Sequence, residues 1–298
     1  MNGARQAAGQ SPNDDFLRHR GLVVRLAYDL TGSWSDAEDI AQEAWVRWQR
    51  VADHGHIADP RAYLARIATN LALDSLRRRK DYPGEYLPEP IPTGPGADAD
   101  LIAAEEIHLA LALVLQSMSP LERAAFVLHE AFGFSHPEIA EILGREPAAV
   151  RQLVHRGRSH VQARRPRFDV DPVEVERVAT AFRDAALGGD LDGLMAVLAE
   201  NVVLVADGGG KASAAIRPIL GADKVARFVL GIAARATEAT TVEFAELNHH
   251  LAWIVRAADR ADQVGWLGVD DGRVTSIHIV RNPDKLARLN PPWLGGHA

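Results

Sequence analysis

Apolar residues recur at helical spacing through the first half of the chain. In the segment 35–51, Ile40, Ala44 and Trp48 fall on one stripe, and Ser35 with Glu38 has the spacing of a capping box. We therefore expect a helix that begins near Ser35 and presents one apolar face. The opposite face is acidic and polar, which is typical of a solvated surface or of a surface that binds a basic partner.

A second helix is expected to follow a short loop. Asp59 suits the N-cap and Pro60 the first helical position, after which apolar residues recur every three to five positions. This segment ends in the consecutive cations of 77–80, and no Lys or Arg then appears before Arg123. Residues 81–106 are rich in proline and acidic residues, so we interpret them as a linker that is held extended by its prolines.

The segment 119–161 has the pattern of a helix-turn-helix. Ser119 precedes Pro120 at the start of one helix, and Ser135 with Glu138 predicts a capping box at the start of the next. Gly144 interrupts the pattern, and a further helix carries an apolar stripe on one side and basic residues on the other. A glycine inside that last helix, Gly157, is expected to permit close packing.

From residue 171 the pattern changes. Two helical segments lead to the apolar run 202–206, a glycine turn at 207–211, one more helix near 223–235 and four alternating runs between 240 and 280. The sequence Asp270-Asp271-Gly272 is a hairpin signal between the last two runs. Helices followed by antiparallel strands predict an α+β domain.

Composition narrows the class of protein. Among 298 residues, 47% are hydrophobic, 24% are charged and none is cysteine, which excludes disulfides and thiolate metal sites and fits a reducing compartment. No export signal or membrane-spanning run is visible, so a cytoplasmic location is expected. The net charge of −7 hides two basic segments: 61–80 has six basic residues and one acidic, and 145–167 has seven and one. Two basic helices on an acidic chain favour a nucleic-acid partner.

The order of these parts resembles an extracytoplasmic-function RNA polymerase sigma factor. The helix at 36–50 resembles the core-polymerase-binding helix of sigma region 2, the helix at 61–80 resembles its −10 element helix, and 119–161 resembles sigma region 4, which reads the −35 element. YLPEP at 86–90, DGGGK at 207–211 and NPDKL at 282–286 resemble motifs of the subgroup with a fused C-terminal SnoaL-like domain, the sigma J type. The resemblance implies two all-α sigma domains joined by a linker and followed by an α+β cone domain, with boundaries at 1–80, 81–106, 107–167 and 171–298.

The resemblance also implies partners and contact residues. Core RNA polymerase and promoter DNA are the expected partners, no membrane or cofactor is expected, and the protein is expected not to be an enzyme. The candidate polymerase-binding residues are Asp39, Gln42, Glu43 and Trp48, with Trp48 preferred to Trp45. For the −10 element they are Asn70, Asp74, Arg77, Arg78 and Lys80, and for the −35 element Arg151, Gln152, His155, Arg156 and Arg158.

The C-terminal domain is expected to regulate the sigma regions by packing against the linker and at least one of them. The candidate regulatory contacts are Tyr86, Leu87, Pro88, Asp207, Gly208, Gly209, Gly210, Lys211, Asn282, Pro283, Asp284 and Lys285. In the alternative, DGGGK and NPDKL only close a hairpin and cap a helix. The cone could also hold a small-molecule ligand or an active site lined by Asp207, His249, His278, Trp253 and Trp266. Two other readings stay open: a helix-turn-helix repressor with a ligand-sensing domain, and a SnoaL-type enzyme with a DNA tether.

Overall fold

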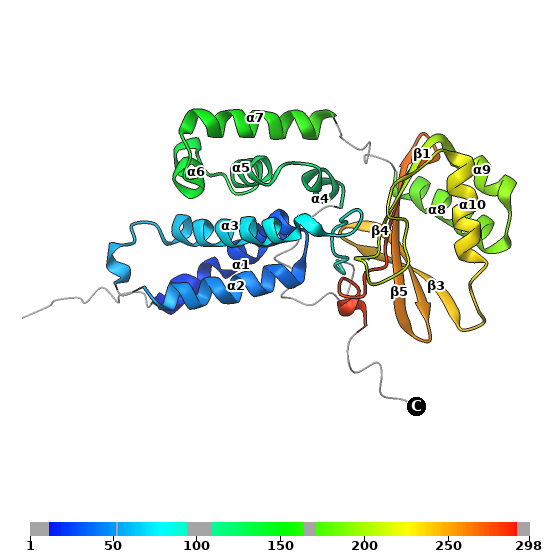
Figure 1. The fold of residues 1–298 in the computed structure, drawn as a ribbon, viewed down its shortest axis with the longest axis horizontal. Coiled ribbons are helices and arrows are strands. Elements are labelled where there is room, and N and C mark those ends of the chain that lie inside the picture. The colour runs from blue at the N-terminus through cyan, green and yellow to red at the C-terminus, as the bar shows by residue number, and fades with distance from the viewer. Residues whose placement is uncertain (1–11, 52, 94–108, 164–170, 291–298) are drawn as a thin grey trace, which may run out of the picture. The chain divides into compact units, whose positions relative to one another are not determined.

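The computed structural model describes residues 12–51, 53–93, 109–163 and 171–290 (Figure 1). These residues form two compact units. The first unit contains the described parts of Met1–Lys80 and Met118–His160, and the second those of Asp81–Ser117 and Val161–Ala298. No described helix is long and apolar enough to cross a membrane.

The first unit opens with a group of packed helices, α1 (Pro12–Thr31), α2 (Trp34–Gln49) and α3 (Pro60–Arg78), with the short 3₁₀ helices η1 (His54–His56) and η2 (Arg79–Asp81). Asp59 caps α3 and Pro60 is its first residue, as expected. The predicted cap of α2 was wrong. Ser33 is the N-cap, with an extended backbone and a side chain that accepts from the Asp36 amide at 3.2 Å, because the buried Trp34 already belongs to the helix.

The helix-turn-helix consists of α5 (Pro120–Glu130), α6 (His136–Leu143) and α7 (Pro147–Ala163). Complete capping boxes begin α5 at Ser119 and α6 at Ser135, and Gly144 ends α6 in the left-handed conformation with φ 61°. A Cβ built on Gly157 would lie 2.8 Å from Cβ of Phe126, so the close packing expected there is confirmed.

Of these helices, α5 packs against α1 and α3, and α6 packs against α3, within the first unit. The guanidinium of Arg61 lies over the Phe134 ring, 4.0 Å from its centroid, and donates a hydrogen bond to the Phe132 carbonyl. Arg123, 4% exposed, donates to the Leu30 carbonyl at 2.5 Å. Cationic side chains thus join the helix-turn-helix to the N-terminal helices.

The second unit is built on a six-stranded sheet with the order β2-β1-β6-β5-β4-β3. Its strands are β1 (Leu198–Asp207), β2 (Ile219–Leu220), β3 (Thr240–Leu247), β4 (His250–Ala257), β5 (Arg260–Asp270) and β6 (Arg273–Val280), and its helices are α4 (Leu109–Gln116), α8 (Pro172–Gly188), α9 (Leu191–Val197) and α10 (Ala222–Ala233). The pair β1–β6 is parallel and the other pairs are antiparallel. Asp271 and Gly272, with φ of 50° and 66°, form the expected turn between β5 and β6.

Each face of this sheet is covered by a different part of the chain. On one face, residues of the sheet such as Val202 and Ile277 form a core with Phe182 of α8 and Val225 of α10. On the other face a second core contains three groups: Leu247, Trp266 and other sheet residues; Leu87 of the linker and Leu109 of α4; and Leu286 and Leu289 after β6. The short helix η4 (Ala287–Leu289) lies in this last segment. The linker and α4 are therefore part of the hydrophobic core of the C-terminal domain.

The observed elements confirm the expected order of helical segments followed by an α+β domain. The linker is described as far as residue 93 and α4 begins at Leu109, and residues 94–108 lie outside the described residues. The distal cations Arg164, Arg165 and Arg167 also lie outside them.

Candidate functional site

Asp207 ends β1 and is fully buried, and its carboxylate binds the linker. Oδ1 accepts from the Tyr82 hydroxyl at 2.5 Å and from the Gly209 amide at 3.0 Å, while Oδ2 accepts from the Leu87 amide at 3.0 Å. A buried carboxylate with several hydrogen bonds still needs a counter-charge. The ammonium of Lys285, whose side chain is 6% exposed, supplies it at 2.6 Å from Oδ2.

Lys285 and Asn282 complete this arrangement from the segment after β6. The Lys285 ammonium also donates to the Leu87 carbonyl and lies 3.1 Å from the centroid of the Tyr86 ring. Asn282 Nδ2 donates to the Tyr82 hydroxyl at 2.9 Å. We call Tyr82, Leu87, Asp207, Asn282 and Lys285 the linker clasp. Burial of the Tyr82 hydroxyl, followed by its hydrogen bond to Asp207, raises the pKa of Tyr82 above its usual value, so it stays a donor.

The glycines of DGGGK make room for the clasp. A Cβ on Gly209 would lie 2.3 Å from Nδ2 of Asn282, and one on Gly210 would lie 2.7 Å from the Pro83 ring. Both glycines have positive φ, 59° and 69°. The turn therefore lets Asn282 and the linker approach the backbone closely.

A second anchor for the linker lies in the turn between β3 and β4. The Asn248 side chain, 1% exposed, accepts from the Ile91 amide at 3.1 Å and donates to the Glu89 carbonyl at 3.3 Å. Asn248 also accepts the Leu109 amide of α4 on its carbonyl at 3.1 Å. Sequence reasoning missed Asn248. The only signal was its place between two alternating runs, which predicts a turn but not a docking role.

The candidate regulatory residues divide into buried and exposed groups. Tyr86 is half-buried and Leu87 and Pro88 are buried against the C-terminal domain, and Gly208 lies against the Ala212 carbonyl. Lys211 and Asp284 pair with each other at 2.5 Å on the surface, with side chains 56% and 62% exposed, and Pro283 is exposed. The Asp207 carboxylate, in contrast, is buried in the clasp.

The candidate −35 residues lie along one exposed side of α7. Arg151, Gln152, His155, Arg156 and Arg158 are all exposed, whereas Val150, Leu153 and Val154 are buried. Arg156 pairs with Glu122 at 2.7 Å and Arg158 with Glu130 at 2.7 Å. Hydrogen bonds from Ser119, and to a smaller extent the positive charge of Arg156, lower the pKa of Glu122. A nucleic-acid phosphate would therefore compete with carboxylates for two of these cations.

The candidate −10 residues lie on the exposed side of α3. Asn70, Asp74, Arg77, Arg78 and Lys80 are exposed, and Arg77 pairs with Asp74 at 2.7 Å. The neighbouring Arg79 differs from them, because it is bound to the Asp36 carboxylate and to the Thr31 carbonyl at 2.5 Å. Arg79 therefore has a structural role that sequence reasoning did not assign.

The candidate polymerase-binding residues lie on α2. Asp39 and Gln42 are exposed, and Glu43 pairs with Arg47 at 2.9 Å on the surface. Trp48 does not belong to this surface. It is 1% exposed, with its ring centroid 4.6 Å from that of His54, so the preference for Trp48 over Trp45 is not supported.

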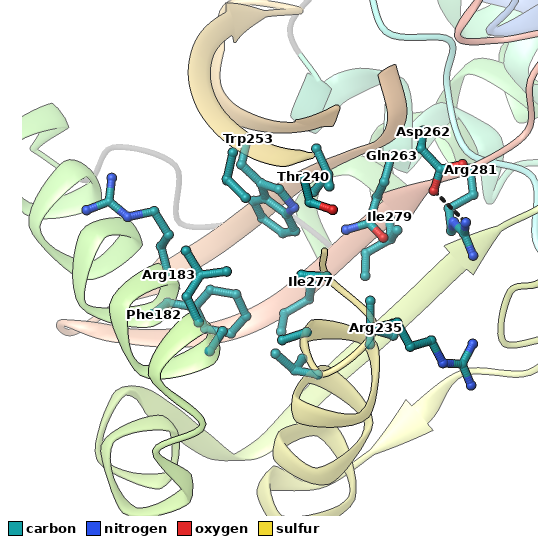
Figure 2. A pocket seen from close by; sticks show the side chains of 18 of the residues that line it. Phe182, Arg183, Arg235, Thr240, Trp253, Asp262, Gln263, Ile277, Ile279 and Arg281 are labelled. Atoms are coloured by element: carbon teal, nitrogen blue, oxygen red, sulfur yellow. Dashed lines mark hydrogen bonds and ion pairs between the residues drawn. The ribbon is translucent and has the colours of Figure 1, made fainter. Parts of the chain in front are cut away.

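The residues proposed to line a cone pocket do not come together. A cavity of about 310 Å³ lies between the sheet, α8 and α10, and of the five candidates only Trp253 lines it (Figure 2). Asp207 belongs to the clasp, Trp266 to the core that contains the linker, and His249 lies in the β3–β4 turn. His278 alternates with the pocket residues Ile277 and Ile279 along β6 and is not part of the lining. Burial lowers the pKa of His278 to about 4.

Comparisons with known proteins agree with this organisation. Family profiles match sigma-70 region 2 over residues 16–82 and sigma-70 region 4 over residues 108–161. The chain is similar to the ECF RNA polymerase sigma factor SigJ of Mycobacterium tuberculosis, with 38% identity covering 95% of this chain and 98% of SigJ. It is also 30% identical to the probable ECF sigma factor SigI of the same species, covering 93% and 96%.

A solved structure supports the same conclusion for the fold. The crystal structure of the M. tuberculosis extracytoplasmic function sigma factor SigJ matches with a TM-score of 0.72 and 36% identity, covering 92% of this chain and 98% of that one. The similarity spans the sigma regions and the C-terminal domain together. The chain therefore belongs to the extracytoplasmic-function family of RNA polymerase sigma factors, the promoter-specificity subunits that bind core polymerase and direct transcription initiation.

Proposed function

We propose that the C-terminal domain regulates this sigma factor in cis by holding the segment that joins region 2 to region 4. The observation that carries the proposal is the linker clasp. One buried carboxylate, Asp207, binds the linker through Tyr82 and Leu87 and is neutralised by Lys285. A simple hairpin turn needs no such buried charge, because burying an ion pair is costly unless hydrogen bonds satisfy it.

The clasp restrains the linker directly after region 2. Residue 80 ends region 2 in our assignment, and the linker from 81 is attached at Asp207 and again at Asn248. The helix α4 belongs by sequence to region 4, which the family profile matches from residue 108, but it packs in the C-terminal unit through Leu109. The C-terminal domain thus holds both the linker and the first helix of region 4.

Release of the linker is the step that we propose to be regulated. The −10 and −35 elements are separated by more than one turn of DNA, so regions 2 and 4 must be separated to contact both. In the first unit these regions are packed together through Arg61 and Arg123. A docked linker favours this packed state, and an undocked linker permits the extended state.

We assign the promoter and polymerase contacts to the exposed residues described above. On α7, Arg151 and Gln152 suit guanine and adenine edges in the major groove, and the other cations suit phosphate. On α3, Asn70 faces solvent beside the terminal cations, where unpaired bases would be read. On α2, Asp39, Gln42 and Glu43 form the polymerase-binding surface.

We propose that the C-terminal domain has no catalytic activity of its own. Among the described residues that line its cavity, the only carboxylate is Asp262, which pairs with Arg281 at 2.5 Å. A general acid or base needs a titratable group that is free to exchange a proton with substrate. A repressor is not favoured either, because region 2 and its acidic helix would then have no role.

Run-off transcription with purified core polymerase tests the regulatory proposal. Asp207→Asn is expected to raise promoter-dependent transcript at limiting sigma concentration, because it weakens the clasp. Asp284→Asn removes the exposed pair with Lys211 and is the matched control, expected to behave as the unmodified protein. Equal transcript from all three proteins, with Asp207→Asn folded, would show that the domain does not regulate through the clasp.

A further inference from the structure

The cavity on the helix-covered face of the sheet has an apolar interior. Its floor is formed by strand residues such as Val242, Val255 and Ile277, and Phe182 of α8 lies against Trp253 with ring centroids 5.9 Å apart. The volume of about 310 Å³ is within the range of small-molecule sites. Because the second core lies on the opposite face, the cavity and the linker are separated by the sheet.

The floor of the cavity is shaped by a glycine. Gly265 on β5 pairs with Trp253 on β4, and a Cβ on Gly265 would lie 2.1 Å from Cζ2 of the indole. Any other residue would displace the indole from the strand. The glycine therefore lets Trp253 lie flat on the sheet, where it presents a broad aromatic surface to the cavity.

Polar groups are found at one side of this apolar space. Strand β5 has a bulge at Asp262, because Gln263 pairs with Val255 and Ala261 pairs with Arg256. Asp262 and Gln263 both line the cavity. Figure 2 shows the Gln263 carboxamide between Thr240 and Ile279. Gln263 is only 7% exposed, and no described residue hydrogen-bonds its side chain. Its carboxamide lines the open space of the cavity, so it is available to hydrogen-bond a polar group of a bound molecule.

Arginine side chains line the rim of the cavity on both sides (Figure 2). Arg235 is exposed at the rim and has no ion pair within the described part of the chain. Arg183 also lines the rim and pairs with its neighbour Asp184 at 2.8 Å, while Arg281 pairs with Asp262. The Arg281 Nε is buried and has no hydrogen-bond partner among the described residues. One cation, Arg235, is therefore in excess at the opening.

We propose that this cavity binds an apolar monocarboxylic acid, with its hydrophobic body against Trp253 and its carboxylate near Gln263 and Arg235. The apolar interior excludes a sugar or a nucleotide, which would leave hydroxyls or phosphates without partners. An amine is disfavoured by the cations at the rim. A neutral hydrocarbon would leave the Gln263 carboxamide unsatisfied.

Isothermal titration calorimetry with the full chain tests the proposal. The probes are decanoate and 2-naphthoate, each compared with its uncharged amide at pH 7.5. At least one acid is expected to bind, and to bind about fivefold more tightly than its amide, since a partly exposed ion pair contributes up to about 1 kcal/mol. Failure of both acids to bind, or equal affinity of acid and amide, would overturn the proposal.

Two variants and one control test whether the acid binds in this cavity. Arg235→Gln is expected to reduce the affinity for the acid to that for the amide, whereas Arg217→Gln, an exposed cation outside the cavity, should leave it unchanged. Ala236→Trp at the exposed rim should weaken both ligands by narrowing the opening. Acid affinity that is the same in Arg235→Gln and the unmodified protein would overturn the assignment of the carboxylate.

Discussion

Replacing Asp207 by asparagine keeps the shape of the side chain but removes the negative charge from the linker clasp. In this variant the ammonium of Lys285, with a side chain 6% exposed, loses its ion pair with Asp207. Removing one partner of a buried ion pair costs about 3–5 kcal/mol. This cost applies mainly to the docked state, because undocking of the linker lets Lys285 reach water. The ratio of undocked to docked protein should therefore rise by roughly 10²-fold or more.

Amide hydrogen exchange measures this shift directly. The Leu87 amide donates to Asp207 and the Ile91 amide to Asn248, so both are protected only while the linker is docked. Asp207→Asn is expected to accelerate exchange at Leu87 by roughly 10²-fold, with amides of α10 unchanged. Asp284→Asn, which breaks only an exposed pair, is expected to change neither amide.

A second substitution separates charge from packing. Adding Lys285→Met to Asp207→Asn removes the ammonium that has lost its ion pair with Asp207 and keeps an apolar side chain of similar length, so part of the lost protection should return. If Leu87 exchanges at the same rate in Asp207→Asn as in the unmodified protein, and the domain is folded, the clasp does not hold the linker and the reasoning fails.

Four further outcomes follow from the structure. Charge reversal at Asp39 and Glu43 should weaken binding to core polymerase in a pull-down without changing duplex binding; unchanged association would leave this face merely solvated. Arg151→Ala should weaken binding to a −35 element and spare core association, measured by fluorescence anisotropy. Gly157→Ala should lower the free energy of unfolding, because overpacking costs about 1–3 kcal/mol while the gain in helix propensity is about 1; an unchanged denaturation midpoint would contradict this. Burial lowers the pKa of His278 from 6.5 to about 4. Between pH 6.5 and pH 4 the imidazole is therefore protonated in the unfolded state but neutral in the folded state. Stability of the C-terminal domain should thus fall by about 3 kcal/mol from pH 7 to 4, and His278→Gln should remove this part of the pH dependence.

Local sequence signals predicted much of the helical part. Pro60 with Asp59, the cap at Ser119 and the capping box at Ser135 are local interactions, and each appears in the structure as expected. Glu122 completes a capping box at Ser119 that was not predicted. The start of α2 was misplaced because Ser33 and Ser35 are both good caps. The burial of Trp34 decides between them, and burial depends on contacts with α1 that no local pattern contains.

The clasp was predictable in part. The motifs that contain Asp207 and Lys285 stood out as unusual, but their pairing joins residues 78 positions apart. Nothing in the sequence distinguishes the buried Lys285 from the exposed Lys211, since each belongs to a short polar motif that also contains an aspartate. Asn248 was missed for the same reason, because its role depends on the linker reaching the β3–β4 turn.

The distance between regions 2 and 4 tests the account most directly. The chain has no cysteine, so Leu17→Cys on α1 and Ser159→Cys on α7, both at exposed positions, allow two spin labels to be attached at unique sites. Pulsed electron paramagnetic resonance should give one short distance in the free protein and a longer one on core polymerase with promoter DNA. Asp207→Asn should populate longer distances in the free protein, whereas Asp284→Asn should not. A free Asp207→Asn protein that keeps the single short distance, although its linker amides exchange freely, would contradict the claim that the clasp keeps the two regions together.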